Sequence, residues 1–433
     1  MQNTATSLVL VELLENTVRP YAWGSPTAIP QLLGQPPSGE PQAELWMGAH
    51  PAAPSRIRRG GDEVTLIECI SADPIRALGA TVAGRFGPRL PFLLKVIAAQ
   101  TSLSLQAHPN QDQAEQGYAD ENAQGIPMTA PVRNYKDPNH KPEVMVALTP
   151  FEALCGFRPV PATIELLELL VMWSRQAEPG TAAYGAANGL EPLVAALHAR
   201  PDADGLREVV TAILTMPEPR AARFVAVVAA ACRLAVSRAD RFDAELRTAV
   251  ELADEYPSNT GVVTSLLLNR VNLAPGEAVY LAAGNLHAYL RGVGIELMAN
   301  SDNVLRGGLT HKYVDVPELL RVLDVTPGPV PAVTARRVSP VEDAFDTPAA
   351  EFRLSRLTLR PGLGSGVPDG SGVPIASSGP QILLTVDGEV TVTDSAGGTL
   401  SLSRGKAAWV PAAAGTVLLS GAAVVFRATT NVD

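Results

Sequence analysis

Apolar residues at helical spacing are concentrated in one long stretch of this chain. The remaining parts therefore have to form their own structure on either side of a helical segment. Between about residues 159 and 258, apolar side chains recur every three or four positions, which places them on one face of a helix. On either side, short apolar runs alternate with turns rich in Pro and Gly, a pattern typical of strands. We therefore expect one inserted helical domain between β-rich parts. The helical segments are 162–173, 190–199, 205–214, 219–235 and 242–255.

The β-rich parts contain apolar runs of strand length and one short polar segment with helix-start signals. Residues 110–122 begin with Asn110 and place Asp112 and Glu115 in the first turn, where carboxylates are favoured. This segment predicts a short helix. From about residue 350 onward the chain is β in character. The strands expected before that point are 91–98, 101–108, 142–148 and 262–268.

A weak internal repeat indicates the kind of β structure. Gly276, Gly284 and His287 match the spacing of the second cupin motif, with alanine in place of the usual proline. Near the C-terminus, Gly405 and Pro411 repeat the first part of that spacing, but no histidine follows. We expect a mainly β protein with two cupin-type jelly-roll barrels, one binding a metal and one degenerate. The expected domains are a catalytic barrel at 1–158 and 259–325, a helical insert at 159–258, and a degenerate barrel at 326–433.

The composition excludes several classes of partner and site. The net charge of −10 argues against nucleic acid or an anionic membrane as the main partner, so any positive charge that binds a phosphate ester must be concentrated locally in the site. The three cysteines are far apart and form no C-x-x-C pair, so we expect buried free thiols in a reducing compartment. Residues 8–11 are apolar but Glu12 and Glu15 follow, which predicts neither a signal peptide nor a membrane span. We expect a cytoplasmic protein. The sequence leaves the oligomeric state open, with a monomer favoured.

Polar side chains at the ends of expected strands can form a metal site. Because alternate residues of a strand face the same side, Ser104, Gln106 and His108 project together, and Lys141 shares a face with Glu143. Two imidazoles, one carboxylate and one amide oxygen suit zinc or another divalent ion with an open position. A neutral amide ligand leaves the ion with more positive charge to polarise a carbonyl. The proposed ligands are Gln106, His108, Glu143 and His287.

Eight ordered segments resemble those of a known family, the type I phosphomannose isomerases. The resemblance covers residues 15–160 and 260–322, with a weaker match at the C-terminus. It implies an aldose–ketose isomerase that interconverts mannose 6-phosphate and fructose 6-phosphate through a cis-enediol, with one zinc ion per subunit. The matching segments are 19–24, 43–51, 91–96, 104–109, 137–143, 284–289, 301–310 and 312–317.

The resemblance also implies roles for single residues. The zinc ligands fall on the four positions named above, and Arg306 is the expected catalytic residue, a fixed cation beside the enediolate. Two positions depart from the family pattern: Ala49 replaces a common Thr, and His311 replaces a common Pro. Neither is a proposed ligand, but the change at His311 puts the role of the neighbouring Lys312 in doubt.

The general base and the substrate contacts stay open at the sequence level. The base candidates are Lys141, Asp302, Glu296 and a metal-bound water. The positive charge of a nearby metal would lower the pKa of Lys141, which favours Lys141 as a base. Pairing with Arg306 would lower the pKa of Asp302, which favours an orienting role for this carboxylate. By family position, the phosphate is expected to contact Ser104, Lys95 and Lys312, and the sugar Trp23, Glu44, Glu296 and Tyr289.

Two other functions are compatible with parts of the sequence. A different metal cupin, such as an iron or manganese dioxygenase, would use three or four His and Glu ligands. The glutamine at Gln106 and the long gap between His108 and Glu143 argue against it. A non-catalytic sugar-phosphate-binding protein would not need Arg306 or a complete ligand set, and both are present.

Overall fold

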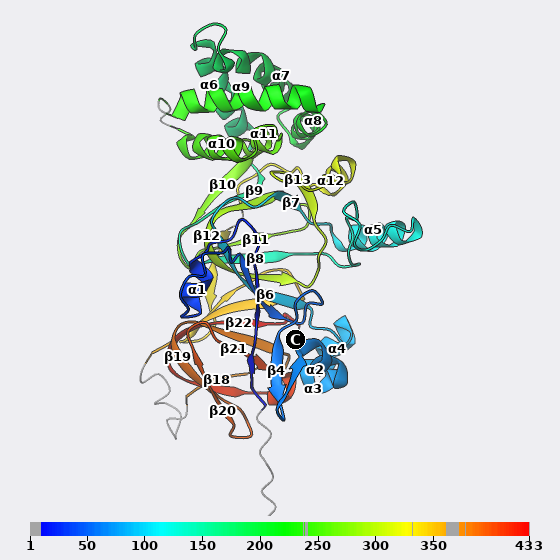
Figure 1. Cartoon of the computed structure of the whole chain (residues 1–433), viewed down its shortest axis with the longest axis vertical. Helices are drawn as coiled ribbons and strands as arrows, with labels where there is room; N and C mark the ends of the chain where they lie inside the picture. The colour runs from blue at the N-terminus through cyan, green and yellow to red at the C-terminus, as the bar shows by residue number, and fades with distance from the viewer. Residues whose placement is uncertain are drawn as a thin grey trace, which may run out of the picture.

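The computed structural model describes residues 10–236, 238, 241–330, 332–360, 372–376 and 378–432. Over these ranges the chain is mainly β with several helices, and its three parts follow one another along the long axis (Figure 1). An 11-stranded sheet lies in the middle, a run of helices at one end and a 9-stranded sheet at the other. No helix within the described ranges is long and apolar enough to cross a membrane.

The strand pairs of the middle sheet are antiparallel, with strand order β14-β11-β8-β12-β6-β3-β2 and two further pairs, β9 with β10 and β7 with β13. The strands expected at 91–98 and 142–148 are confirmed as β6 and β8, and the run 101–108 is a strand only at β7. The strands are β2 (Thr17–Arg19), β3 (Glu44–Gly48), β6 (Phe92–Ala99), β7 (Leu105–Ala107), β8 (Glu143–Ala147), β9 (Phe151–Phe157), β10 (Leu268–Leu273), β11 (Ala278–Leu281), β12 (His287–Ala299), β13 (Leu305–Gly308) and β14 (Ala332–Val333).

Strand β12 joins the two parts of this sheet. Its first half pairs with β7 and β9, and its second half with β6 and β8. The change of partners occurs around Gly292, whose φ is +124°, a conformation that residues with a side chain rarely adopt. A Cβ at Gly292 would also lie 2.7 Å from the carbonyl oxygen of Pro150. Glycine is therefore required where β12 turns from one set of neighbours to the other.

The expected helical segments are confirmed as five long helices, whose apolar core is continuous with one side of the middle sheet through residues such as Leu105 and Leu154. The chain leaves the sheet at Phe157 and returns at Leu268, and these two residues pair with each other across β9 and β10. The strand expected at 262–268 is wrong, because residues 261–265 form a helix. The five residues are all buried, Thr264 and Ser265 included, and a single helical turn is too short for its period to be recognised. The helices are α6 (Val160–Arg175), α7 (Ala182–Ala199), α8 (Ala203–Leu214), α9 (Glu218–Val236), α10 (Asp243–Glu255) and α11 (Gly261–Ser265).

Shorter helices lie beside both sheets, with α5 next to the middle sheet and α2 to α4 at the level of the C-terminal sheet (Figure 1). The helix expected at 110–122 is confirmed as α5, and the side chain of Asn110 caps it. Three consecutive short helices, α2 to α4, were not predicted, although Thr65 and Glu68 form a capping box at the start of α2. The shorter helices and one hairpin are α1 (Ala28–Leu32), α2 (Leu66–Ala72), α3 (Pro74–Leu78), α4 (Ala80–Phe86), α5 (Gln111–Ala123), α12 (Val316–Val322), β4 (Arg56–Arg59) and β5 (Asp62–Thr65).

The C-terminal sheet packs against the middle sheet through one apolar core, which includes Phe92 from one side and Trp409 and Phe426 from the other. Its order is β1-β21-β19-β22-β17-β16-β15. A strand near the N-terminus, β1, is thus at one end of the strand order of a sheet that is otherwise made by the C-terminal part. The strands are β1 (Glu12–Leu14), β15 (Ala335–Arg337), β16 (Glu342–Phe345), β17 (Arg353–Leu359), β18 (Val373–Ile375), β19 (Gln381–Thr393), β20 (Thr399–Ser403), β21 (Ala407–Val410) and β22 (Val417–Thr429).

Candidate metal centre and cavity

Two histidines and a glutamate meet inside the middle sheet. His108 follows β7, Glu143 begins β8 and His287 begins β12, and one nitrogen or oxygen atom from each lies within 4.8 Å of the others. The Nε2 atoms of His108 and His287 are each 3.5 Å from a carboxylate oxygen of Glu143. All three side chains are buried. The sequence-based grouping of these three residues therefore corresponds to a real cluster.

The histidine rings are oriented so that bare nitrogens face the centre. Nδ1 of His108 lies 2.7 Å from the carbonyl oxygen of Asn303, and Nδ1 of His287 lies 3.0 Å from that of Asn285. A carbonyl only accepts hydrogen bonds, so each Nδ1 donates and each Nε2 keeps a lone pair. Both Nε2 atoms are buried without a hydrogen-bond partner. Burial and the charge of Lys141 lower the pKa of His108 to about 4, so its ring is neutral. A ring whose Nδ1 is held by a carbonyl oxygen, with Nε2 left without a hydrogen-bond partner, is typical of a metal ligand.

Gln106 lies between the histidine pair and the expected catalytic arginine. It is directly opposite His287 on one neighbouring strand and opposite Arg306 on the other. Side chains of directly opposed residues project from the same face of a sheet. The short strand β7 thus places the side chains of Gln106, His287 and Arg306 on one face. The strands of His287 and Arg306 lie on opposite sides of β7, and neighbouring strands are spaced by about 4.8 Å.

Lys141 contributes charge directly at the carboxylate of the cluster. Its Nζ lies 3.2 Å from Oε1 of Glu143, and the lysine side chain is buried. Burial alone would raise the pKa of Glu143, but Lys141 and His108 lower it well below its usual value. Glu143 is therefore ionised and able to serve as an anionic ligand.

A second buried network lies across the strands next to the cluster. Lys95 is directly opposite both Trp46 and Glu296, and its Nζ lies 3.1 Å from Glu296 and 3.6 Å from Glu44. Although burial lowers the pKa of Lys95, the two carboxylates raise it above its ordinary value. Tyr289 donates a 2.8 Å hydrogen bond to Oε1 of Glu296. Burial raises the pKa of Glu296 despite Lys95.

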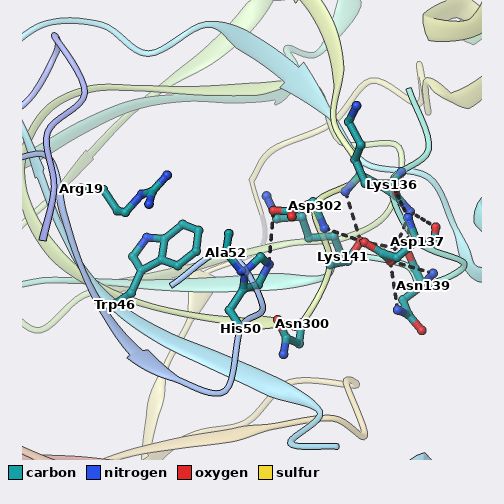
Figure 2. Close-up of polar contacts among 12 residues, drawn as sticks. Arg19, Trp46, His50, Ala52, Lys136, Asp137, Asn139, Lys141, Asn300 and Asp302 are labelled. Carbon is teal, nitrogen blue, oxygen red and sulfur yellow. Dashed lines mark hydrogen bonds and ion pairs between the residues drawn. The ribbon is translucent and has the colours of Figure 1, made fainter. Parts of the chain in front are cut away.

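His50 holds the side chain of Asp302, as Figure 2 shows. Nδ1 of His50 accepts a hydrogen bond from the backbone N–H of Ala52 at 3.2 Å, so the proton is on Nε2, which lies 3.3 Å from Oδ1 of Asp302. The edge of the imidazole packs against Trp46, with ring centroids 4.8 Å apart. Burial raises the pKa of Asp302, but His50 lowers it below its usual value overall. Asp302 is thus an oriented carboxylate.

Asn303 connects the metal cluster to the loop before β8. Its carbonyl oxygen receives the Nδ1–H of His108, while its side chain is fully buried. The side-chain amide donates to the carbonyl oxygens of Asp137 and Asn139, and its oxygen accepts from the backbone N–H of Lys136 at 2.7 Å. One asparagine therefore fixes both a candidate ligand and the loop that lines the site.

These side chains surround a single cavity of about 1340 Å³. The cavity reaches from Trp23 to the loop at Lys312 and includes most residues expected to touch the substrate or perform chemistry. His108 and His287 do not line it directly, but Glu143 contacts both and does. The sequence-predicted lining residues are Trp23, Glu44, Lys95, Ser104, Gln106, Lys141, Glu143, Tyr289, Glu296, Asp302, Arg306 and Lys312.

Comparisons with known proteins show which family this chain belongs to. Residues 11–160 match the model of a family described as phosphomannose isomerase type I, catalytic domain. The mannose-6-phosphate isomerase of Escherichia coli strain K12 is 39% identical over 415 residues, which cover 95% of this chain and 97% of that protein. The chain belongs to the type I phosphomannose isomerases.

Other type I phosphomannose isomerases extend the match. The mannose-6-phosphate isomerase of Salmonella typhimurium strain LT2 is 42% identical over 348 residues, 80% of this chain and 83% of that protein. A crystal structure of the Salmonella typhimurium enzyme bound to fructose 6-phosphate and zinc has a TM-score of 0.83 and 36% identity, and covers 98% of this chain and 100% of that one. The family fold thus extends over nearly the whole chain.

Three residues of the site were missed by sequence reasoning. His50 and Asn303 lie within segments that resemble type I phosphomannose isomerases, and Lys136 directly precedes one, but none of them was given a role. Their contacts join positions far apart in the chain, such as Asn303 with His108. His50 lies in the same family-like segment as Glu44, an expected sugar contact, and this was the signal that the sequence offered. Its contact with Asp302 could be recognised only once the pairing of the strands was known.

Proposed function

We propose that this chain is a zinc-dependent isomerase that interconverts mannose 6-phosphate and fructose 6-phosphate through a cis-enediol. The main support is the buried cluster of His108, Glu143 and His287, with both Nε2 atoms bare and turned toward the carboxylate. A relative of this fold binds zinc and fructose 6-phosphate together. Neutral imidazoles and an ionised carboxylate are the donors that zinc prefers.

Gln106, His108, Glu143 and His287 would hold the ion. Gln106 lines the cavity and is paired with His287 in register, which supports it as the fourth ligand. When bound, zinc supplies a Lewis acid that polarises a substrate oxygen. The carbonyl oxygens of Asn303 and Asn285 keep the two rings in the tautomer that the ion requires.

The remaining chemistry belongs to side chains that line the cavity. Arg306 stabilises the developing enediolate, and its charge has no carboxylate partner within 4.0 Å in the described part of the chain. Proton transfer between C1 and C2 falls to Lys141 or Asp302, because Glu296 is already bonded through one oxygen to Tyr289 and faces Lys95 with the other. The ordered, ionised carboxylate of Asp302 and the cation of Lys141 face the same cavity.

Substrate contacts and the wider organisation complete the proposal. Ser104 and Lys312 contact the phosphate, and Trp23, Tyr289, Glu44 and Glu296 form the wall for the sugar. We assign residues 1–158 and 259–325 to a catalytic cupin barrel, 159–258 to a helical insert and 326–433 to a degenerate cupin barrel. The run of helices between the paired residues Phe157 and Leu268 supports this division. We place the protein in the cytoplasm as a monomer with one zinc ion per subunit.

A coupled assay tests the proposed activity. Formation of fructose 6-phosphate from mannose 6-phosphate is followed with the purified protein as isolated, after removal of metal with a chelator, and after return of zinc. We expect activity that is lost with the metal and restored by zinc. Oxygen consumption with bound iron would favour a dioxygenase instead. Tight binding of fructose 6-phosphate with no turnover under any metal would leave only a sugar-phosphate-binding protein.

A further inference from the structure

The lysines of this chain are unusually placed. Of 34 basic residues only five are lysines, at positions 95, 136, 141, 312 and 406, and the remainder are arginines. Four of these five line the cavity described above, while the fifth lies in the turn between β20 and β21. A chain that uses arginine almost everywhere else therefore uses lysine where the cavity wall is built. A compact, flexible ammonium group serves a different purpose there from a planar guanidinium.

Two of the cavity lysines have their charge balanced by the protein. Lys95 lies between Glu44 and Glu296, within 3.6 and 3.1 Å. Lys141 lies 3.2 Å from Glu143. Both side chains are buried, so neither can turn to a new anion without leaving a carboxylate unpaired.

The other two are not balanced. Neither Lys136 nor Lys312 has a carboxylate within 4.0 Å among the residues that the structure describes. Nζ of Lys136 donates to the carbonyl oxygen of Met128 at 2.7 Å, which positions the ammonium group and leaves two of its three protons free. Burial and the nearby charge of Arg306 lower the pKa of Lys312. The pKa of Lys136 is lowered by burial and, in part, by Arg306 as well.

The backbone of Lys136 is held by Asn303. Its N–H donates to the side chain of Asn303, which in turn holds Asp137 and Asn139, and its side chain extends away from this cluster (Figure 2). Lys136, Lys312 and Arg306 line the cavity, and none of them forms an ion pair within 4.0 Å among the described residues. Positive charges without a paired carboxylate stabilise a bound anion. A phosphate monoester has a charge near −2 at neutral pH and three acceptor oxygens.

We propose that Lys136, together with Lys312, binds the phosphate of the substrate, and that Lys95 does not. This assignment rests on the proposed function for the identity of the substrate. Lys95 supports the cavity wall through its two carboxylates, while the two unbalanced lysines neutralise the phosphate dianion beside Arg306. The phosphate end of the cavity is then the end formed by Met128, Lys136 and the loop from Thr310 to Lys312.

Lys136→Met is the decisive variant, with Lys406→Met as the matched control and Lys136→Arg as the conservative one. For Lys136→Met we expect KM for mannose 6-phosphate and the competitive inhibition constant of inorganic phosphate to rise together by about tenfold, because a charge-assisted hydrogen bond is lost. We expect kcat to stay within about threefold of wild type. Lys136→Arg retains most of the affinity, and Lys406→Met leaves every constant unchanged.

Equilibrium binding of fructose 6-phosphate, measured by calorimetry, separates this proposal from the proposed function. Binding needs no turnover, so it can be measured even if the wild type has no activity. If the wild type is inactive but its affinity falls about tenfold in Lys136→Met, the proposed isomerase function is wrong and the phosphate contact is supported. Unchanged binding and unchanged phosphate inhibition in a folded Lys136→Met protein would overturn the proposal. So would a fall in kcat with KM unchanged. Thermal unfolding of each variant shows whether the protein compared is folded.

Discussion

Replacing Lys95 with Met should destabilise the protein in a way that depends on pH. The substitution leaves Glu44 and Glu296 facing each other's charge, with side chains only 10% and 4% exposed. Removing one partner of a buried ion pair costs about 3–5 kcal/mol. The variant can limit this cost by protonating Glu296, whose pKa burial already raises above the ordinary 4.5.

The size of the pH effect follows from the cost of that proton. Protonating a carboxylate of pKa 4.5 costs 1.36 kcal/mol per pH unit above it, so about 5 kcal/mol at pH 8 and about 2 kcal/mol at pH 6. A group with a raised pKa in the folded state contributes stability that is complete below its unfolded pKa and is lost as pH rises through its folded pKa. The Lys95→Met variant should therefore lose about 2–3 kcal/mol more at pH 8 than at pH 6, relative to wild type.

Urea unfolding of wild type and variant at both pH values, at one fixed zinc concentration, measures this difference. Zinc must be fixed because a ligand of the folded state adds its own stability. The double variant with Glu296→Gln removes one of the unpaired charges, so we expect it to recover part of the loss at pH 8. Equal destabilisation at the two pH values would refute the role of the carboxylates. A stable variant with a tenfold higher KM would instead make Lys95 a phosphate ligand.

Three further substitutions test single features of the site. Arg306→Ala should lower kcat by about a hundredfold or more with the fold intact, as measured in the coupled assay, and a kcat near that of wild type would remove Arg306 from the chemistry. His50→Ala removes a hydrogen bond that lowers the pKa of Asp302. The acid limb of the kcat/KM profile should therefore move to higher pH, and an unmoved limb would argue against Asp302 as the base. Gly284→Ala should cost about 2–4 kcal/mol in urea unfolding, because φ is +76° and a Cβ would lie 2.8 Å from the backbone nitrogen of Asp324. Wild-type stability would show that this turn can relax.

The sequence was sufficient for the parts of the site that lie on regular strands. Strand alternation grouped Lys141 with Glu143, and the two side chains are in contact in the structure. The order of His108, Glu143 and His287 along the chain, each at a strand end, was enough to propose their meeting. The helical segments were predictable for the same reason, because each shows one apolar face over three or more turns.

Features set by contacts between distant strands were not predictable. Lys95 reads as an apolar-strand lysine or a phosphate ligand until the register of β3, β6 and β12 places Glu44 and Glu296 beside it. The hydrogen bond from His50 to Asp302 depends on a loop closing over some 250 positions of intervening chain. The helix at 261–265 was missed because it is a single turn in which apolar and polar residues alike are buried, so the sequence shows no exposed side that would mark its period.

The shape of strand β12 has a consequence for how the protein would tolerate loss of its ion. His287, Tyr289 and Glu296 lie on this one strand, which is hydrogen-bonded to four others. The backbone of the proposed ligand His287 is therefore held by the sheet and does not depend on the ion. Amide protons of β12 should therefore exchange slowly after the metal has been removed, and zinc should rebind to a sheet that has stayed folded.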